Sequence, residues 1–125
     1  MQRSMRYENL MAYQKSFFLA MQIFEISKSF PMEERYALTD QIRRSSRSVA
    51  AAIAESYGKR KYPKHFINKL TDSDSENLET QTWLRFALEC KYINSREYER
   101  LMEESTQVGK LLSHMLRFPE KFGSK

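Results

Sequence analysis

The chain has 125 residues, 41% of them hydrophobic and 30% charged, which is the composition of a globular domain and not of a disordered segment. Its single cysteine, Cys90, excludes an internal disulfide, and its longest strongly apolar run, residues 17–21, is far shorter than the roughly 20 residues of a membrane-spanning helix. Because residues 1–10 lack the apolar region of a signal peptide, we expect a cytoplasmic protein that has no membrane partner.

The first predicted helix covers residues 7–29 and ends at Phe30-Pro31, because the residue before a proline is pushed out of the α region. Two apolar stripes run along it on about opposite sides. One stripe contains Leu10, Tyr13, Phe17, Ala20, Met21 and Phe24, and the other contains Ala12, Leu19, Ile23, Ile26 and Phe30. A surface helix of a monomer needs one apolar face, so the second stripe predicts contact with another copy.

The second predicted helix covers residues 38–57 and has an apolar inner face. Three arginines, Arg43, Arg44 and Arg47, fall within about 100° of arc on the opposite side. The turn that follows continues the positive charge with Lys59, Arg60 and Lys61, and Lys64 comes after Pro63.

The third predicted helix covers residues 63–91, with Pro63 as its first residue. Its inner stripe is apolar at both ends and polar in the middle, at Ser73, Asn77 and Gln81. We expect these three residues to form a hydrogen-bonded layer that fixes the register of the helices. Cys90 follows Trp83 and Phe86 on the far side, where we expect a buried outer face and an inert thiol.

The fourth predicted helix covers residues 95–117 and begins with a capping box, Asn94 and Glu97. Pro119 ends it, and we expect a frayed tail after it. Four helices with short connections pack most simply as an antiparallel up-down-up-down four-helix bundle. The sequence therefore predicts an all-α protein with one domain, residues 1–125.

The charge is unevenly distributed along the chain. Residues 35–70 carry a net charge of +7, whereas residues 71–105 carry −5. One half of the bundle is therefore expected to be basic and the other acidic. This pattern fits an anionic partner, and it equally fits head-to-tail contact between copies of the chain.

Catalytic and metal-binding motifs find no support in the sequence. Leu111 stands three residues before His114 and Tyr62 three before His65, so neither histidine completes the Glu-x-x-His pair of di-iron bundles. The three glycines cannot form a phosphate-binding loop. We expect no metal, no cofactor and no enzymatic activity; an enzyme would need a pocket with converging polar groups, for which Ser73, Asn77 and Gln81 are the candidates.

The basic residues are the candidate functional site. Guanidinium groups bind phosphate bidentately, and clustered positive charge favours nucleic acid of any sequence. Tyr57, Tyr62 and His65 near the turn are candidates for stacking on unpaired bases. The predicted nucleic-acid-binding residues are Arg43, Arg44, Arg47, Lys59, Arg60, Lys61 and Lys64. The alternative is a structural or adaptor protein whose basic and acidic halves mediate self-assembly and bind a protein partner.

Several segments together resemble a known family. They are residues 7–10, the block Leu38-Thr39-Asp40-Gln41-Ile42-Arg43-Arg44, the later Ile53-Ala54-Glu55, and Leu78-Glu79-Thr80-Gln81. In this order they resemble the bacterial four-helix-bundle proteins encoded in intervening sequences of 23S rRNA genes. The resemblance implies a homo-oligomer, most simply a pentamer. It also implies similarity to the accessory protein of diversity-generating retroelements, a basic ring that binds nucleic acid and a reverse transcriptase.

The resemblance singles out some positions and fails at others. The matching positions are Gln41, Arg43, Arg44, Ser48, Glu55 and Glu79. The family pattern has proline, asparagine and glycine where this chain has Ala50, Ala52 and Ser56. Without that proline, we expect the second helix to be straighter.

Overall fold

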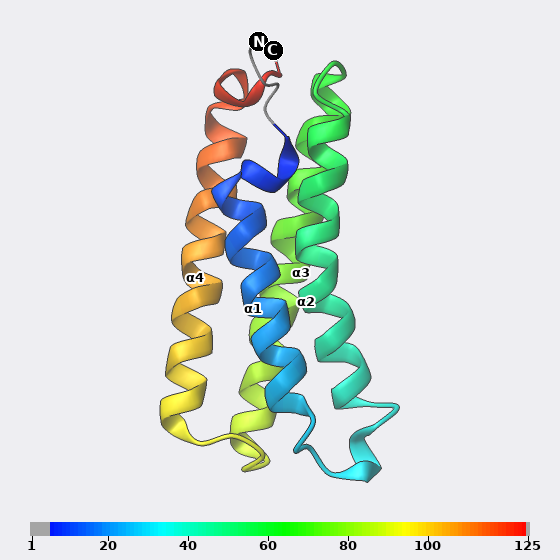
Figure 1. Cartoon of the computed structure of the whole chain (residues 1–125), viewed down its shortest axis with the longest axis vertical. Helices are drawn as coiled ribbons and strands as arrows, with labels where there is room; N and C mark the ends of the chain where they lie inside the picture. The colour runs from blue at the N-terminus through cyan, green and yellow to red at the C-terminus, as the bar shows by residue number, and fades with distance from the viewer. Residues whose placement is uncertain (1–5, 125) are drawn as a thin grey trace.

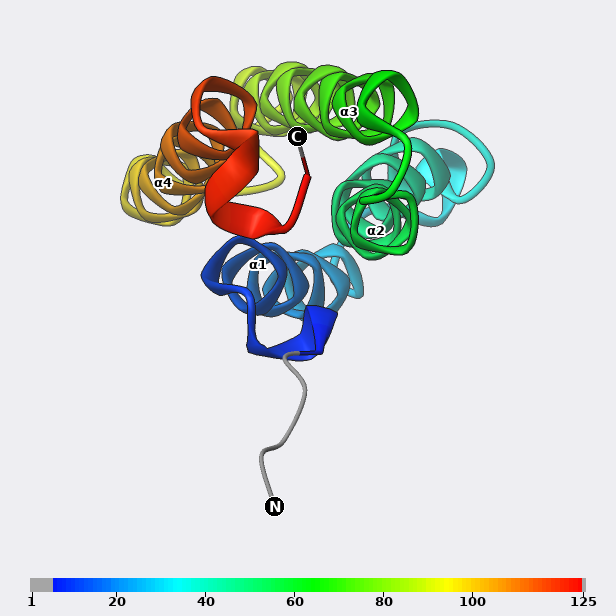
Figure 2. The ribbon, with the colours of Figure 1, turned by 90° about the horizontal axis from the view of Figure 1, so that it is seen from above.

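The computed structural model describes residues 6–124, and four α-helices run alternately up and down in it (Figure 1). They are α1 (Met11–Ser27), α2 (Leu38–Gly58), α3 (Pro63–Glu89) and α4 (Ser95–Arg117). Three short 3-10 turns are η1 (Tyr7–Asn9), η2 (Met32–Glu34) and η3 (Pro119–Phe122). Each helix packs against two others, α1 and α3 both lying between α2 and α4, as the view along the bundle shows (Figure 2). The predicted all-α four-helix bundle is confirmed.

The first helix begins later than the predicted residue 7. Residues 7–9 form the turn η1, and Leu10 has an extended backbone, with φ −70° and ψ 130°, before α1 starts at Met11. The Leu10 side chain is buried in the core. The helix therefore begins only after Leu10, whose extended backbone places its side chain in the interior.

The third helix ends at Glu89, two residues before the predicted end. Lys91 adopts the left-handed conformation, with φ 65°. The backbone N–H of Tyr92 donates to the carbonyl of Ala87, and the N–H of Lys91 donates to that of Leu88, which is the Schellman pattern of a helix end. Cys90 caps this end and is exposed, so the prediction of a buried thiol was wrong.

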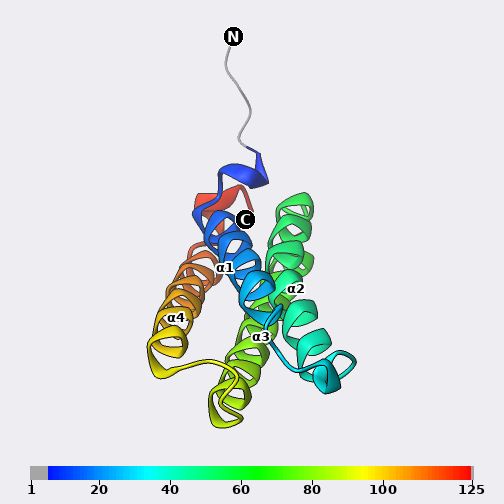
Figure 3. The same ribbon diagram turned by 60° about the horizontal axis from the view of Figure 1, so that its bottom comes forward.

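The core consists of two apolar clusters at the two ends of the bundle. The cluster toward the α2–α3 turn is formed by Leu10, Ala12, Val49, Ile53, Tyr57, Phe66, Leu70, Val108, Leu112 and Met115. The cluster toward the α1–α2 and α3–α4 connections, the end that Figure 3 brings forward, is formed by Leu19, Ile23, Phe30, Leu38, Ile42, Leu84, Ala87, Ile93 and Leu101. Burial of these side chains supplies most of the driving force for folding.

A buried polar layer separates the two clusters. Asn77 of α3 donates to the carbonyl of Ser105 on α4 at 2.9 Å and accepts from the Ser105 hydroxyl at 2.8 Å. Gln81 donates to the same hydroxyl oxygen at 2.9 Å, and Ser73 donates to the carbonyl of Val49 on α2 at 2.8 Å. These bonds confirm the predicted layer of Ser73, Asn77 and Gln81.

The layer also joins α2 to α3 through hydroxyl groups. Ser45 and Thr80 share a hydrogen bond of 2.8 Å between their side-chain oxygens, and both residues are buried. Gly109 of α4 lies next to the layer, since a side-chain carbon there would be in van der Waals contact with Nδ2 of Asn77 at 3.4 Å. α2, α3 and α4 are therefore held at one level by polar contacts.

The C-terminal segment packs against the bundle as far as Ser124, whereas the sequence predicts a frayed tail; Lys125 lies outside the described residues. After η3 the N–H of Ser124 donates to the carbonyl of Pro119, and Ser124 is buried. Phe122 packs against the cluster near the α2–α3 turn. The apolar contacts of Phe122 hold the segment across the end of the bundle.

Substitution of Asn77 by alanine tests the polar layer. We expect Asn77→Ala to lower the free energy of unfolding by about 2–3 kcal/mol, because the Ser105 hydroxyl loses its buried acceptor and a small void remains. Urea denaturation followed by circular dichroism measures this change. The matched control is Asn68→Ala, an exposed residue of the same helix, for which we expect less than about 0.5 kcal/mol. Equal losses in the two variants would contradict the role of the layer.

Substitution of Asn94 tests the start of α4. The Asn94 side chain accepts from the N–H of Glu97 at 2.8 Å, and the Glu97 carboxylate accepts from the N–H of Asn94 at 2.9 Å. We expect Asn94→Ala to cost about 1 kcal/mol of unfolding free energy in the same measurement. Asn94→Asp retains an acceptor and is expected to stay within about 0.5 kcal/mol of the parent chain. A loss of similar size in Asn94→Asp would mean that the capping bond is not the cause.

Candidate nucleic-acid interface

The end of the bundle that carries the α2–α3 turn is strongly basic. Within residues 57–65 and 114–124 there are six lysines and arginines and one acidic residue, Glu120. The six are Lys59, Arg60, Lys61, Lys64, Arg117 and Lys121, and we call them the basic tip. All except Arg60 are exposed, whereas Arg60 is half-buried.

Arg60 is held by contacts on two sides. Its Nε donates to the carbonyl of Tyr57 at 2.7 Å, and its guanidinium carbon lies 3.6 Å from the centre of the Tyr57 ring. The C-terminal segment lies against its other side, because a side-chain carbon on Gly123 would come within 3.2 Å of Arg60 Cδ. Gly123 has φ +87°, which favours glycine at this turn. These contacts fix the guanidinium before any ligand binds.

A recess of about 430 Å³ opens beside Arg60. Tyr57, Gly58, Arg60, Lys61, Tyr62 and Gly123 line it. Tyr62 is 59% exposed and packs edge-on against His65, with the ring centres 6.0 Å apart. Tyr62 and His65 are therefore accessible for stacking, as the sequence predicts. Tyr57 is buried beneath Arg60, so its ring is not accessible to a base.

Arg117 and Lys121 belong to the tip, although they are not among the binding residues predicted from the sequence. Both lie near Phe118, with the Arg117 guanidinium carbon 5.5 Å and the Lys121 Nζ 4.4 Å from the ring centre. They were overlooked because the tail was expected to fray. The apolar residues Phe118 and Phe122 around Pro119 are a sequence signal for a packed tail.

Two of the three helix arginines lie on the side of α2 that faces α1. Arg43 Nε donates to the Ser27 hydroxyl at 2.7 Å, and its guanidinium carbon lies 4.8 Å from the centre of the Phe24 ring. The guanidinium carbon of Arg47 lies 5.5 Å from the same ring. Arg43 and Arg47 therefore help to attach α1 to α2 by cation–π contact.

Arg44 lies near the acidic part of α3. Burial raises the pKa of the Glu76 carboxyl and the adjacent Glu79 raises it further, while the positive charge of Arg44 acts in the opposite direction. Arg44 is exposed and lies close enough to Glu76 to lower the pKa of that carboxyl.

The seven predicted residues therefore do not form one surface. Lys59, Arg60, Lys61 and Lys64 meet at the tip, whereas Arg47, the nearest of the helix arginines, lies roughly 18 Å away along the helix at 1.5 Å per residue. The ion pairs between described residues are Arg6–Glu8, Lys28–Glu25, Lys69–Glu55 and Arg85–Glu89. None of the seven takes part in these pairs.

The described residues also bear on metal binding and on membrane insertion. Within residues 6–124, no three His, Cys, Asp or Glu side chains are grouped so that they could hold a metal ion. None of the helices in the described part of the chain is long and apolar enough to cross a bilayer.

Comparison with known proteins identifies the family. A comparison with curated protein sequences gave no match. Among solved structures, the bundle is similar to a protein of unknown function from the S23 ribosomal protein family of Bacteroides thetaiotaomicron VPI-5482. The two chains are 30% identical, the match covers 85% of this chain and 95% of the other, and the TM-score is 0.76. The model of the 23S rRNA-intervening sequence proteins matches residues 8–114. This chain therefore belongs to the 23S rRNA-intervening sequence protein family.

Proposed function

We propose that the protein is a non-enzymatic, self-associating bundle that binds nucleic acid, RNA or DNA, through its basic tip. The observation that carries this proposal is the convergence of six basic side chains from the α2–α3 turn and the C-terminal segment, with one carboxylate among them. Nearby phosphates release counterions when such a cluster binds them, which favours binding irrespective of sequence.

The aromatic side chains at the tip favour unpaired strands. Tyr62 is exposed beside Arg60 and Lys61, and the exposed ring of His65 packs edge-on against it. A base can stack on the face of an exposed ring. The phosphates on either side of that base would then meet Lys59, Lys61 and Lys64. A duplex offers its phosphates but no free base, so only the electrostatic contribution to the binding free energy would remain for it.

The absence of enzymatic activity is part of the proposal. Ser73, Asn77 and Gln81, the polar residues from which a reactive pocket would be built, are hydrogen-bonded to Val49 and Ser105 inside the core. Their polar atoms are used to join helices, which supports a structural role.

A second candidate is an adaptor that binds a protein, for which a reverse transcriptase is the partner by family analogy. The exposed large apolar side chains favour it, since Phe17, Phe18 and Met21 of α1 and Leu78 and Phe86 of α3 all lie at the surface. Such residues suit a protein contact more than a phosphate contact. The basic tip distinguishes the two functions, because nucleic-acid binding depends on it and an apolar contact does not.

Removal of three lysines tests the tip. We expect the triple variant Lys59→Ala, Lys61→Ala and Lys64→Ala to bind single-stranded RNA more weakly at all salt concentrations. The slope of log K against log[salt] should fall in magnitude by about 2, since each phosphate contact with a single strand contributes about 0.7. Fluorescence anisotropy with a labelled single-stranded RNA at rising salt measures both quantities.

The control for this prediction removes the same charge from the opposite end of the bundle. Lys28→Ala, Arg35→Ala and Arg96→Ala are exposed substitutions near the α1–α2 and α3–α4 connections. We expect this control to keep the salt slope of the parent chain. Equal losses of binding in both variants would show that net charge, and not the tip, is responsible. If the parent chain does not bind single-stranded RNA at low salt, the proposal is wrong.

Substitution of Tyr62 tests stacking. We expect Tyr62→Ala to weaken binding of single-stranded RNA by about 1–3 kcal/mol, the value of one base stacked on an aromatic ring. Binding of duplex DNA should change little in the same assay. Tyr62→Phe keeps the ring and should bind like the parent chain. An equal effect of Tyr62→Ala on both nucleic acids would rule out stacking as its cause.

A further inference from the structure

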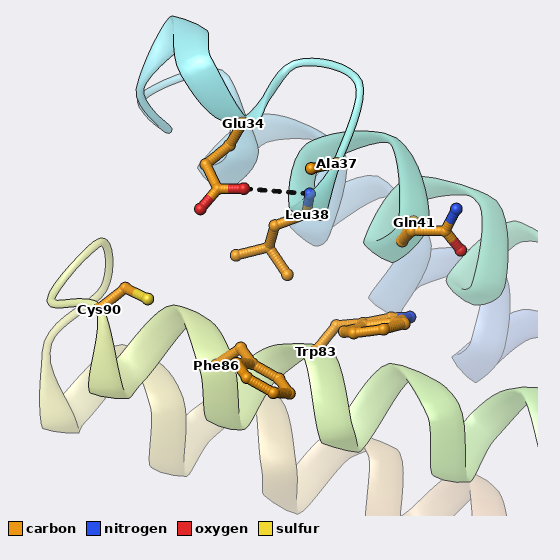
Figure 4. A pocket seen from close by; sticks show the side chains of 7 residues that line it. All are labelled: Glu34, Ala37, Leu38, Gln41, Trp83, Phe86 and Cys90. Atoms are coloured by element: carbon orange, nitrogen blue, oxygen red, sulfur yellow. Dashed lines mark hydrogen bonds between the residues drawn. The ribbon is translucent and has the colours of Figure 1, made fainter.

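Two apolar hollows occur on different sides of the bundle. The first, which we call face A, lies between α1 and α2 and measures about 340 Å³. Tyr7, Tyr13, Phe17, Ala20, Met21, Arg47, Ala50, Ala51 and Ala54 line it. The second, face B, lies between the start of α2 and the end of α3 and measures about 270 Å³ (Figure 4). Glu34, Ala37, Leu38, Gln41, Trp83, Phe86 and Cys90 line it.

The composition of each face matches that of a protein contact. Face A combines aromatic side chains of α1 with three alanines of α2, and the short alanines leave room for side chains of another molecule. In face B the rings of Trp83 and Phe86 lie below Leu38 and Ala37, as Figure 4 shows. Phe17 of face A is 51% exposed and Phe86 of face B is 53% exposed, so each face also offers a large projecting side chain.

The charges of the two faces are opposite. Arg47 is the one charged residue in the lining of face A, and Glu34 is the one charged residue in the lining of face B. The Glu34 carboxylate is held in place, since it accepts from the N–H of Leu38 at 3.2 Å and from the Tyr92 hydroxyl at 2.8 Å. Arg47 forms no ion pair with any residue in 6–124.

Face B also contains one buried polar atom without a partner. Nε1 of Trp83 is buried and has no hydrogen-bond partner among the described residues. Gln41 is half-buried beside it, as Figure 4 shows. A buried donor without an acceptor costs free energy in the single chain.

We propose that face A of one copy of this chain binds face B of a second copy. The apolar hollows, the projecting phenylalanines and the opposite charges of Arg47 and Glu34 all fit this pairing. This inference rests on the self-association in the proposed function and identifies its surfaces. Because the two faces differ, the contact is heterologous, and repeated contacts give a closed ring or a filament.

Glutamate substitutions at the two phenylalanines test the contact. We expect Phe17→Glu and Phe86→Glu each to reduce the assembly to monomers, with at least about a tenfold weaker association, because an unpaired charge is buried in an apolar contact. The matched controls are Phe18→Glu on α1 and Leu78→Glu on α3, where the side chains are 62% and 55% exposed and outside both faces. Both controls should keep the mass of the parent assembly in light scattering, and circular dichroism of all four checks that they fold.

Mixing the two variants gives the decisive result. Phe17→Glu retains an intact face B and Phe86→Glu retains an intact face A, so a mixture should form a 1:1 dimer and nothing larger. The chain has a single tryptophan, Trp83 in face B, so its emission should shift to shorter wavelength when the dimer forms. Monomers alone in the mixture, or unchanged assembly by either single variant, would overturn the inference.

The outcomes separate this inference from the proposed function. If Phe17→Glu and Phe86→Glu each assemble as well as the parent chain, the protein still self-associates, but faces A and B are not the surfaces through which it does so. A parent chain that is monomeric at all concentrations refutes both self-association and this contact. In that case RNA binding by the basic tip is still measured on the monomer, and its result decides the rest of the proposed function.

Discussion

Asn77 and Ser105 exchange two hydrogen bonds in the middle of the bundle, where each side chain is shielded from water. Apolar contacts alone define the register of packed helices weakly, because leucine and isoleucine can be exchanged along a stripe at little cost. A buried amide behaves differently, since a shift of one helical turn would separate it from its partners and leave them unsatisfied. The polar layer therefore determines the level at which α3 meets α4. Through the hydrogen bond between Ser45 and Thr80 it also determines the level at which α2 meets α3.

This register determines which side chains become neighbours at the surface. With α2 and α3 fixed against each other, the turn that joins them projects Lys59, Lys61 and Lys64 beyond the apolar cluster. Because the level of α4 is also fixed, its last turn and η3 lie at the same end of the bundle, where Gly123 lies against Arg60. At the other end the same register sets Trp83 and Phe86 opposite the first turn of α2. The basic tip and face B thus arise from one constraint at the centre.

The sequence predicted the fold well because its signals are local. Helical spacing, Pro63 at the start of α3 and the capping box at Asn94 each act within a few residues, and they placed the starts of α2, α3 and α4 at the observed residues. The site depends on contacts between distant segments. Arg43 and Arg47 lie on Phe24 because of the way α1 faces α2. The tail packs beside Arg60 because α4 ends next to the α2–α3 turn. Helical spacing put the three arginines on one arc of α2, but it carries no information about α1.

The positions of the tip and the two faces bear on how binding and assembly act together. The tip occupies the end of the bundle, whereas faces A and B lie between neighbouring helices, so the proposed contact between the faces would leave the tip open. If the proposed self-association and nucleic-acid binding both hold, several tips joined in one assembly would meet one strand at a high effective concentration, and overall affinity would exceed that of a single tip without any new contact. A single tip with six cations would bind weakly at physiological salt, because its contribution would be largely electrostatic. Assembly would then be the physical means by which a small basic end becomes an effective nucleic-acid-binding surface.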